Sequence, residues 1–553
     1  MSGKTEEFTE HIIDPGPVKK TKGNSLVKSG AMLSLLTLMS RILGLIREAV
    51  KGAFLGTTAL ADAFTISFMI PNLLRRLFAE NSISVAFIPT FKEYLEEDKK
   101  NACGVEGEST REFLSSFFTL LTFLVSLTVV IGILITPLIV PVFGTISDES
   151  ILLTRIMFPY LFFISLAAFF QGILNGVKVF SPSGFTPVLF NSCVIIFTLL
   201  LHKRMENPAR AMALGVVVGG AVQCFFQLPF ILRRKIRFSF VSLKKAFCNK
   251  GTRTVLKLIA PTIIGMAAYQ LNDVVSSALA GHSDPGVVSS LQYSLRIQEL
   301  ILGIFAVSIG TVLLPDLTSY AYSKQWEDFN STLKKSMNII ALITIPVTFY
   351  CLLLGENIIS LIFQGHAFSR DSVNLTMDAF VWHISGLYFI ALNRIIAPAF
   401  YAQKDTKSPT VAGIISFAVN IGVAVLLAGT YKGKGIAFAL SFASFTNTIA
   451  LFFYMKKNRN FSVGFLIKDT ILYGLKMILF SLVASVPVYF LKPIFIKLGE
   501  NFSGGFLSRV AVQGIPVLLS ALVFACAGIF LLVITKDSVF IQAKKMILRG
   551  KKK

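Results

Sequence analysis

The chain has few charged residues for its length, and it lacks the common nucleotide and metal motifs. Only 15% of its 553 residues are charged. The one lysine- and glycine-rich stretch, YKGKG at 431–435, lacks the spacing and the Ser or Thr of a phosphate-binding P-loop. The five histidines are dispersed, and none belongs to an H-E-x-x-H motif. We therefore expect no enzyme, no ATP hydrolysis, and neither a metal nor another cofactor.

Cysteine is also sparse, and no nucleic-acid motif accompanies the basic residues. The six cysteines are scattered with no C-x-x-C pair, so we expect small apolar side chains rather than disulfides or metal ligands. The net charge of +23 comes from Lys and Arg that fall between hydrophobic spans. This placement is typical of loops that face anionic lipid, and it predicts membrane lipids, not nucleic acid, as partners.

What the chain has in excess is hydrophobic sequence, at 54% of residues. About 20 apolar residues are enough for a helix to cross a bilayer. By this criterion we count fourteen spans, at 28–50, 58–79, 112–136, 151–175, 183–201, 210–232, 254–281, 287–314, 334–354, 374–400, 409–428, 434–455, 468–491 and 507–535. The predicted fold class is an all-α, polytopic integral membrane protein with about 14 transmembrane helices.

The spans divide into two groups of six and a final pair. AFIPTFKEYLEE follows the second span and TVLLPDLTSYAYSK follows the eighth, and each places a Pro and then an aromatic residue at a helix end. Parallel echoes six helices apart are typical of transporters built from repeats. We predict a disordered cytoplasmic tail, two pseudo-symmetric six-helix lobes, two C-terminal helices and a basic cytoplasmic tail, at residues 1–27, 28–236, 237–457, 458–536 and 537–553.

The basic residues of the connections set the predicted orientation. RRKIR at 233–237 and the pair Lys244 and Lys245 fall in one even-numbered connection, whereas the connections after spans 3 and 7 carry no Lys or Arg. Cytoplasmic loops carry an excess of these residues, so both termini are predicted to be cytoplasmic. Basic residues at 203–204 and at 432 and 434 are exceptions to this pattern.

Residues 31–94 combine two hydrophobic spans with an unusual number of charges. The charged residues in question are Arg41, Arg47, Glu48, Asp62, Arg75, Arg76 and Glu80. A charge at the bilayer centre costs about 2.5–3.5 kcal/mol on insertion scales, so several together are not expected to face lipid. Arg41 and Glu48 are seven residues apart and share one helix face. We expect a wet, cationic cavity; the alternative for Arg75 and Arg76, which we favour for Arg76, is that they only extend to the membrane interface.

A second charged pair lies in the eighth span, LQYSLRIQELILGIF. Arg296 and Glu299 are three residues apart and adjacent on one face. Guanidinium binds phosphate through two parallel hydrogen bonds, so Arg41, Arg47 and Arg296 are predicted to bind a diphosphate. In the alternative, Arg296 and Glu299 pair and only hold helices together. The two alternatives are compatible if Glu48 and Glu299 orient the arginines until the substrate arrives.

The source of energy is the least constrained feature. Without a nucleotide motif, direction must come from Na⁺, H⁺, the membrane potential or downstream consumption of the substrate; the potential supplies about 2.3 kcal/mol per charge per 100 mV. Asp273, in QLNDVVSSALAG, and Asn420, in the eleventh span, are the candidate cation site. The alternative is that Asp273 is simply hydrogen-bonded.

Several of these segments resemble one known family. The run SRILGLIREA…ADAF…IPNLLRRLFAENSISVAFIPTF, continued by YSLRIQELILGIFAVSIGTVLLP and APAFYAQKDTKSPT, resembles the MurJ (MviN) family. Members are lipid II flippases of bacterial cell-wall synthesis, in the multidrug/oligosaccharidyl-lipid/polysaccharide exporter superfamily. The resemblance implies transport of lipid II, an undecaprenyl-diphosphate muropeptide, to the outer leaflet of the inner membrane by alternating access, with peptidoglycan synthesis and division machinery as partners.

The resemblance also implies roles for individual residues. The family's cavity arginines match Arg41, Arg47 and Arg296, its gating positions match Asp62 and Arg75, and its pairing acids are matched by Glu48 and Glu299, with Glu80 nearby. Glu48 replaces the family's usual Asp, and Leu295 replaces an acidic neighbour of the eighth-span arginine, so the local pairing can differ. The last two spans are implied to form a groove for the polyprenyl tail.

Two other functions remain open from the residues alone. A cation or drug antiporter of the same superfamily predicts an acidic cavity, whereas the charges here are mostly basic. A scaffold of the division machinery that transports nothing predicts that neutral substitutions of the cavity residues keep full function.

Overall fold

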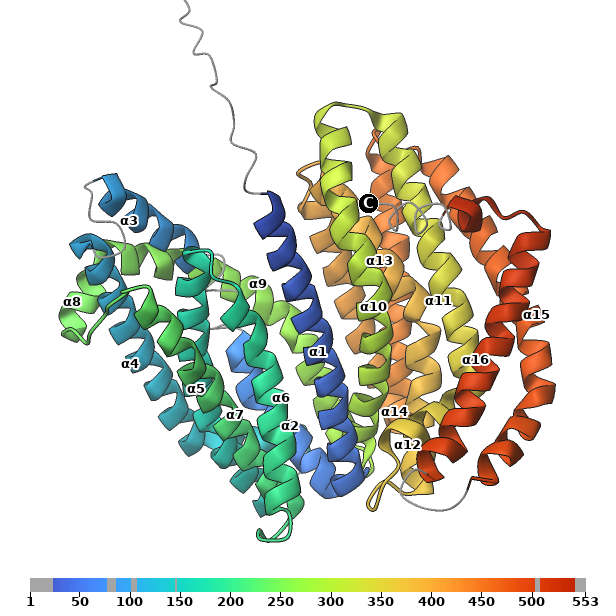
Figure 1. Ribbon diagram of the computed structural model, residues 1–553, viewed down its shortest axis with the longest axis horizontal. Helices are drawn as coiled ribbons and strands as arrows, with labels where there is room; N and C mark the ends of the chain where they lie inside the picture. The colour runs from blue at the N-terminus through green and yellow to red at the C-terminus, as the bar shows by residue number, and fades with distance from the viewer. Residues whose placement is uncertain (1–22, 77–85, 101–106, 145–146, 503–507, 543–553) are drawn as a thin grey trace, which may run out of the picture.

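The computed structural model is a two-lobed bundle of long helices (Figure 1). It describes residues 23–76, 86–100, 107–144, 147–502 and 508–542, so Glu80 and most of both predicted tails lie outside the described residues. The first lobe contains α1 (Gly23–Leu55), α2 (Ala59–Arg75), α3 (Ile88–Lys100), α4 (Glu108–Ile139), η4 (Val140–Phe143), α5 (Asp148–Gly176), α6 (Ser181–Leu201) and α7 (Pro208–Arg233). After α8 (Leu243–Cys248) and α9 (Lys250–Gly281) come α10 (Val287–Tyr322), α11 (Trp326–Phe363), α12 (Arg370–Ser385), α13 (Leu387–Tyr401), α14 (Lys407–Lys457), α15 (Val463–Glu500) and α16 (Ser508–Ile534).

Each of the fourteen predicted spans corresponds to helix in the structure. Two differences concern where helices end. Spans 409–428 and 434–455 follow each other directly in α14, which is broken at Lys432 by a positive φ of 49°. The tenth span is bent by 40° between α12 and α13. By length and composition, eight of the described helices qualify as spans, or nine with the bent pair. The prediction of an all-α membrane fold is confirmed.

Four helices that meet where the lobes face each other, α1, α2, α9 and α10, are not among those that qualify. They carry most of the charged residues noted in the sequence, and α2, described over only 17 residues, is too short by itself. Elsewhere the surface is apolar: Leu138 is 76% exposed and Leu426 is 78% exposed. Such wide apolar exposure is what a lipid-facing surface requires.

The two lobes are in contact at the end where α1 is followed by α2. There the hydroxyl of Tyr293 on α10 donates to the carbonyl of Gly56 at 3.0 Å, and Thr57 Oγ1 lies 2.8 Å from Ser372 Oγ at the start of α12. In Figure 1 the ribbons of the two lobes diverge from this end toward the end where α1 begins. We call the contact region the closed end.

The connection after α7 stays with the first lobe, although the predicted boundary falls at 236/237. The amide of Ser239 donates to Ser115 Oγ and that of Val241 to Thr119 Oγ1, both at 3.1 Å and both on α4. Gly251, at the start of α9, lies against the ring of Phe113, where a Cβ would clash. Farther along, α9 packs on α14 of the second lobe. Helix α9 therefore contacts both lobes.

Candidate substrate site between the lobes

A cluster of charged side chains lies where α1 of the first lobe meets α10 of the second. Glu48 is at its centre and is 7% exposed. Its carboxylate is 2.7 Å from Arg47 Nη2, 3.3 Å from Lys51 Nζ and 3.8 Å from Arg296 Nε. Arg296 also pairs with Glu299, at 2.8 Å. We call these five residues the charge cluster.

The α1 part of the cluster follows from helix geometry. Glu48 and Lys51 are three residues apart and therefore share one face. Arg47 points to the other side of the carboxylate, where its guanidinium lies 5.8 Å from the ring of Phe68 and 5.7 Å from that of Phe190. Aromatic faces attract a cation and hold its plane. Glu48 and the two rings thus hold Arg47 in place before any ligand arrives.

Lys51 is a member of the cluster that the sequence analysis did not single out. It is 5% exposed, and its ammonium donates to Thr65 Oγ1 at 3.1 Å and lies 4.7 Å from the ring centre of Tyr293. Lys51 therefore joins α1 to α2 and to α10 of the other lobe. A signal was present in the sequence, since Lys51 is one turn beyond Glu48, but a lysine near a helix end normally extends to the interface.

Arg41 lies two turns before Glu48, against the backbone of α10. A Cβ built on Gly303 would overlap Nη1 of Arg41, so the missing side chain of Gly303 makes room for the guanidinium. Gly303 is two turns beyond Arg296, and Arg41 is two turns before Glu48. Because α1 and α10 run antiparallel here, Arg296 lies opposite Glu48 and Gly303 lies opposite Arg41. The structure thus brings all three predicted diphosphate-binding arginines to the α1–α10 interface.

The side chains that face this interface carry net positive charge. Arg41, Arg47, Lys51 and Arg296 are opposed by the carboxylates of Glu48 and Glu299. Arg296 and Glu299 remain 41% and 55% exposed, so their pairing leaves them open to a ligand. Both readings of this pair, an ion pair and part of a cationic cavity, are compatible with this geometry.

Asp62 contacts the other lobe at the closed end. Its carboxylate, 2% exposed, accepts the amides of Gly286 at 2.6 Å and Ser289 at 2.7 Å. Gly286 is the N-cap residue of α10 and offers no side chain of its own, so Asp62 caps that helix from α2. A carboxylate at a helix N-terminus also interacts favourably with the helix dipole. Asp62 therefore joins the two lobes, which a gating residue must do.

Arg75 and Arg76, at the far end of α2, lie in different surroundings. Arg75 Nε donates to Asn72 Oδ1 at 2.9 Å, and Arg75 lines a small polar cavity inside the first lobe. Arg76 Nη1 donates to Gln270 Oε1 at 3.0 Å and to Asp273 Oδ2 at 3.3 Å on α9. Arg76 therefore also contacts α9, through a partner 197 residues away in the sequence, which the expectation of a role at the membrane interface alone did not include.

The two candidate cation ligands are not brought together by any contact that the structure records. Asp273 pairs with Arg76, whereas Asn420 Nδ2 donates to Asn272 Oδ1 at 2.5 Å and to Ser276 Oγ at 3.5 Å. In the described part of the chain no group of three or more His, Cys, Asp or Glu side chains is placed to hold a metal ion. A coupling role for Asp273 and Asn420 remains a prediction.

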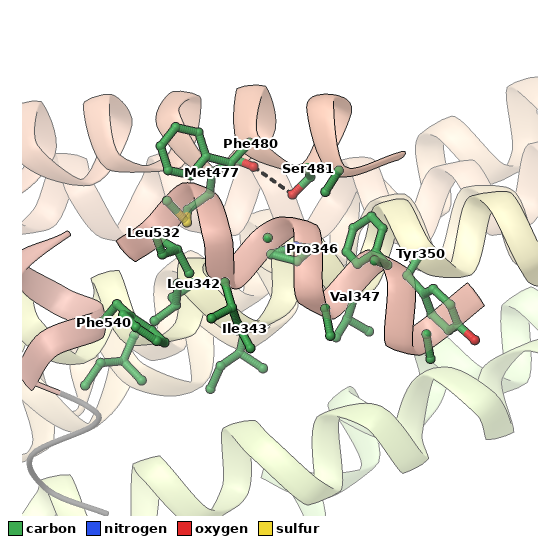
Figure 2. Close-up of a pocket in the computed structure, with 17 residues that line it drawn as sticks. Leu342, Ile343, Pro346, Val347, Tyr350, Met477, Phe480, Ser481, Leu532 and Phe540 are labelled. Carbon is green, nitrogen blue, oxygen red and sulfur yellow. Dashed lines mark hydrogen bonds between the residues drawn. The ribbon is translucent and has the colours of Figure 1, made fainter. Parts of the chain in front are cut away.

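An apolar cavity lies between α11 and the final helix pair, α15 and α16. Its volume is about 800 Å³, and Figure 2 shows the apolar side chains of Leu342, Val347, Phe480 and Leu532 at its wall. Lining residues run along α11 from Ile339 to Tyr350, a helix length of about 16 Å. We call this cavity the apolar groove; it is lined by the final helix pair, for which the resemblance implied a groove.

A buried carboxylate beyond α16 fixes one end of the apolar groove. Asp537 accepts from Lys476 Nζ at 2.6 Å, from the hydroxyl of Tyr473 at 3.1 Å and from the amide of Phe540 at 2.8 Å. Burial alone would raise the pKa of Asp537, but these hydrogen bonds outweigh it and hold the pKa below its ordinary value. Phe540, placed in this way, lines the groove.

Two helical lobes around a charged interface, with the lobes closed at one end, define a membrane transporter of the alternating-access type. The model of the family described as "Lipid II flippase MurJ" matches residues 52–546. The chain therefore belongs to the MurJ family of lipid II flippases, and the family prediction from sequence is confirmed.

Individual relatives are similar in sequence to this chain over most of its length. It is 45% identical over 529 residues to the "Probable lipid II flippase MurJ" of Treponema pallidum (strain Nichols), covering 95% of this chain and 98% of the relative. The corresponding protein of Vibrio cholerae is 32% identical, with 78% and 83% covered.

Solved structures show the same fold. A lipid II flippase MurJ in an inward closed conformation matches with a TM-score of 0.72 and 27% identity, covering 92% of this chain and 99% of that one. An inward-facing multidrug resistance transporter of the MATE family matches with a TM-score of 0.61 at 13% identity, over 78% and 96% of the two chains, which shows a shared fold alone.

Proposed function

We propose that this protein moves lipid II, chemically unchanged, from the cytoplasmic to the outer leaflet of the bacterial inner membrane. The observation that carries the proposal is the charge cluster, which places several cations at the interface of the two lobes. A diphosphate head group is too polar to cross hydrocarbon unaided, and fixed guanidinium groups replace the water that it loses. A drug or cation antiporter would need the opposite charge at this position.

In the proposed mechanism the diphosphate binds to Arg41, Arg47 and Arg296 while the lobes are open to the cytoplasm. Glu48 and Glu299 hold the arginines until then and are displaced as counter-ions by the phosphates. Lys51 adds a further positive charge beside Glu48. The exchange of one anion for another keeps the cations compensated in both states, and Glu48 retains Lys51 as its partner, so no buried charge is left unpaired.

The lipid tail stays outside the charged region in this proposal. The apolar groove along α11, α15 and α16 offers a lining of hydrocarbon side chains suited to a polyprenyl chain. The groove is shorter than such a chain, so part of the tail remains in the bilayer.

Rocking of the lobes then exposes the head group on the outer side. This step must break the contacts of the closed end, including the cap of α10 by Asp62 and the bond of Tyr293 to Gly56. We assign the closed end to the outer side and both termini to the cytoplasm, following the distribution of Lys and Arg. The membrane potential or a Na⁺ or H⁺ gradient supplies direction, and peptidoglycan synthesis and division proteins receive the product.

The proposal is tested in bacteria depleted of their own lipid II flippase. Wild-type protein is expected to restore growth and the appearance of lipid II on the outer leaflet, detected with a reagent that does not cross the membrane. Arg41→Ala, Arg47→Ala and Arg296→Ala are expected to insert normally and restore neither. The proposal fails if inserted wild-type protein leaves lipid II inside, or if all three variants act as wild type.

A further inference from the structure

His383 is a buried residue of α12 that the proposed mechanism does not use. It is 2% exposed, and its ring nitrogen Nδ1 lies 2.7 Å from Oγ of Ser294 on α10. Its backbone carbonyl accepts from Nε2 of Gln298, which is also on α10. Ser294 and Gln298 are four residues apart, so they lie on one face of that helix. One residue of α12 is therefore bound to α10 at two points, one helical turn apart.

These two points lie on either side of Arg296 in the sequence. Arg296 is two residues from each of them, and two residues turn a helix by about 200°. Arg296 therefore leaves α10 on the opposite face, toward Glu48 of α1. Ser294 and Gln298 are buried, whereas the side chain of Arg296 is 41% exposed. Helix α10 thus separates His383 from the substrate site, and His383 acts on Arg296 only through the helix backbone.

The rotation of α10 about its own axis decides where the guanidinium of Arg296 lies. A helix with its side chains has a radius of about 5–6 Å, so a rotation by about 20° moves a group at its surface by about 2 Å. Hydrogen bonds weaken steeply over such a shift. The two bonds between α10 and His383 oppose this rotation, because they are one turn apart on the back of the helix. His383 thereby holds Arg296 where it meets Glu48.

The tenth span is broken shortly after His383. Helices α12 and α13 meet there at an angle of 40°, at Gly386. Side chains of three other helices donate to the carbonyls before the break, namely Ser441 of α14 to Trp382 at 2.6 Å, Thr348 of α11 to Ile384 at 3.3 Å, and Gln298 of α10 to His383. A helix broken inside a membrane needs such donors for its freed carbonyls. Because side chains satisfy these carbonyls, α12 is able to change its angle to α13 without exposing them.

The other end of α12 belongs to the closed end (Figure 1). Ser372, in the first turn of α12, has its Oγ 2.8 Å from Oγ1 of Thr57 in the first lobe. Ser372 and His383 are eleven residues apart, which is about 16 Å of continuous helix. A helix of this length moves as one piece. A displacement of α10 at Arg296 is therefore carried by α12 to the contact between the lobes.

We propose that His383 is a positioning residue for Arg296, and that α12 transmits the state of Arg296 to the closed end. The inference rests on the proposed function, in which Arg296 exchanges Glu48 for a phosphate. As the guanidinium moves to the phosphate, α10 turns, and its two bonds to His383 pull α12 about the break. The contact of α12 with Thr57 is released when substrate is bound, so the empty protein keeps its closed end shut.

The test compares variants of the complete protein, reconstituted in lipid nanodiscs. His383→Leu keeps a side chain of similar size and removes its nitrogens, whereas His383→Asn keeps a polar atom at the position of Nδ1. Ser294→Ala removes the partner of that atom on α10. The matched control is Thr448→Val, which removes a buried hydroxyl that donates to Asn393 at 2.8 Å within the second lobe.

Two quantities are measured for each variant. The first is the affinity for polyprenyl diphosphate. The second is the rate at which Ser289→Cys reacts with a charged thiol reagent, with and without saturating polyprenyl diphosphate. Ser289 is fully buried at the closed end, where its amide donates to Asp62 of the first lobe, so a cysteine there reacts when the lobes part. Protein without the introduced cysteine gives the background rate.

With His383 intact, we expect saturating ligand to raise the reaction rate of Ser289→Cys. His383→Leu and Ser294→Ala should each lower the affinity about fivefold, the worth of one neutral hydrogen bond. They should also at least halve the rise in rate at saturation, which a loss of affinity alone does not do. His383→Asn and Thr448→Val should stay within twofold of the wild type. The double variant His383→Leu with Ser294→Ala should bind no worse than His383→Leu, because both remove the same bond.

The inference is wrong if His383→Leu and Ser294→Ala bind and respond as the wild type does. It is also wrong if His383→Asn fails as His383→Leu does, or if Thr448→Val fails equally, because the effect then comes from packing. Ser294→Ala decides the question if His383→Leu does not insert. Wild-type protein that moves lipid II, with Arg296→Ala inactive and His383→Leu responding normally, contradicts this inference and leaves the proposed function standing. Wild-type protein that does not bind polyprenyl diphosphate contradicts the proposed function itself.

Discussion

Replacement of Gly303 by Ala tests the position of Arg41 without touching its charge. The added methyl group would occupy the place of Nη1 of Arg41, so the guanidinium must move away from α10. The substitution itself is mild, because Ala is a better helix former than Gly. We therefore expect Gly303→Ala to fold and insert normally and to bind the diphosphate poorly.

The size of the effect follows from the overlap. A normal contact needs about 3.5 Å between the new carbon and the nitrogen, so the guanidinium must shift by about 2 Å. A hydrogen bond weakens steeply over such a shift, and one bond from a charged donor is worth about 1.5–3 kcal/mol. Loss of one such bond lowers affinity about ten- to hundredfold.

The assay is binding of polyprenyl diphosphate, followed by lipid II exposure in depleted cells. Gly413→Ala, on α14, is the matched control, because no atom lies within 4 Å of the added Cβ. Arg41→Ala sets the full loss for comparison. If Arg41→Ala is inactive and Gly303→Ala transports as wild type, then Arg41 does not act from the position described here.

Three further predictions concern other parts of the molecule. Lys51→Met removes one cation near the bound phosphates and should lower diphosphate affinity about fivefold, an effect of about 1 kcal/mol, whereas Lys51→Arg should retain the affinity. Asp62→Asn keeps only one of two bonds to the start of α10, so Thr57→Cys at the closed end should react faster with an external thiol reagent in this background; an unchanged rate would contradict the capping role. Because the folded pKa of Asp537 is lowered, its stabilising effect is present above its ordinary pKa of 3.8 and is lost as pH falls through the folded value. The melting temperatures of wild type and Asp537→Asn should therefore differ at pH 7 and converge in acid; a constant difference would refute this.

The sequence predicted helices well because a bilayer imposes one length and one polarity. Helix ends were less predictable: the eighth predicted span ends at residue 314, whereas α10 continues to Tyr322. Beyond the hydrocarbon a helix is no longer required to be apolar, so hydropathy cannot locate its end. The break at Lys432 lies between two predicted spans, as expected, but the sequence did not predict that helix would resume at once.

The residues of the site could be predicted where they are charged residues inside an apolar span. Arg47, Glu48 and Arg296 stood out because charge inside a span is costly. The contacts of Lys51 with Thr65 and Tyr293 depend on three helices meeting, and no spacing along the chain encodes that. The contact of Arg76 with Asp273 also joins two helices that are distant in the sequence. From the sequence, Asp273 was predicted as a ligand for a bound cation instead.

Helix α9 sets a mechanical limit on how the two lobes move. It starts against Phe113 in the first lobe and later holds Asn420 of the second through Asn272. Its 32 residues give a rod of about 48 Å whose hydrogen bonds prevent stretching. When the lobes change their angle, a rod anchored on both of them has to bend, slide at one anchor or lose a contact. The distance between Arg76 and Asp273, partway along that rod, should therefore change with the angle between the two lobes.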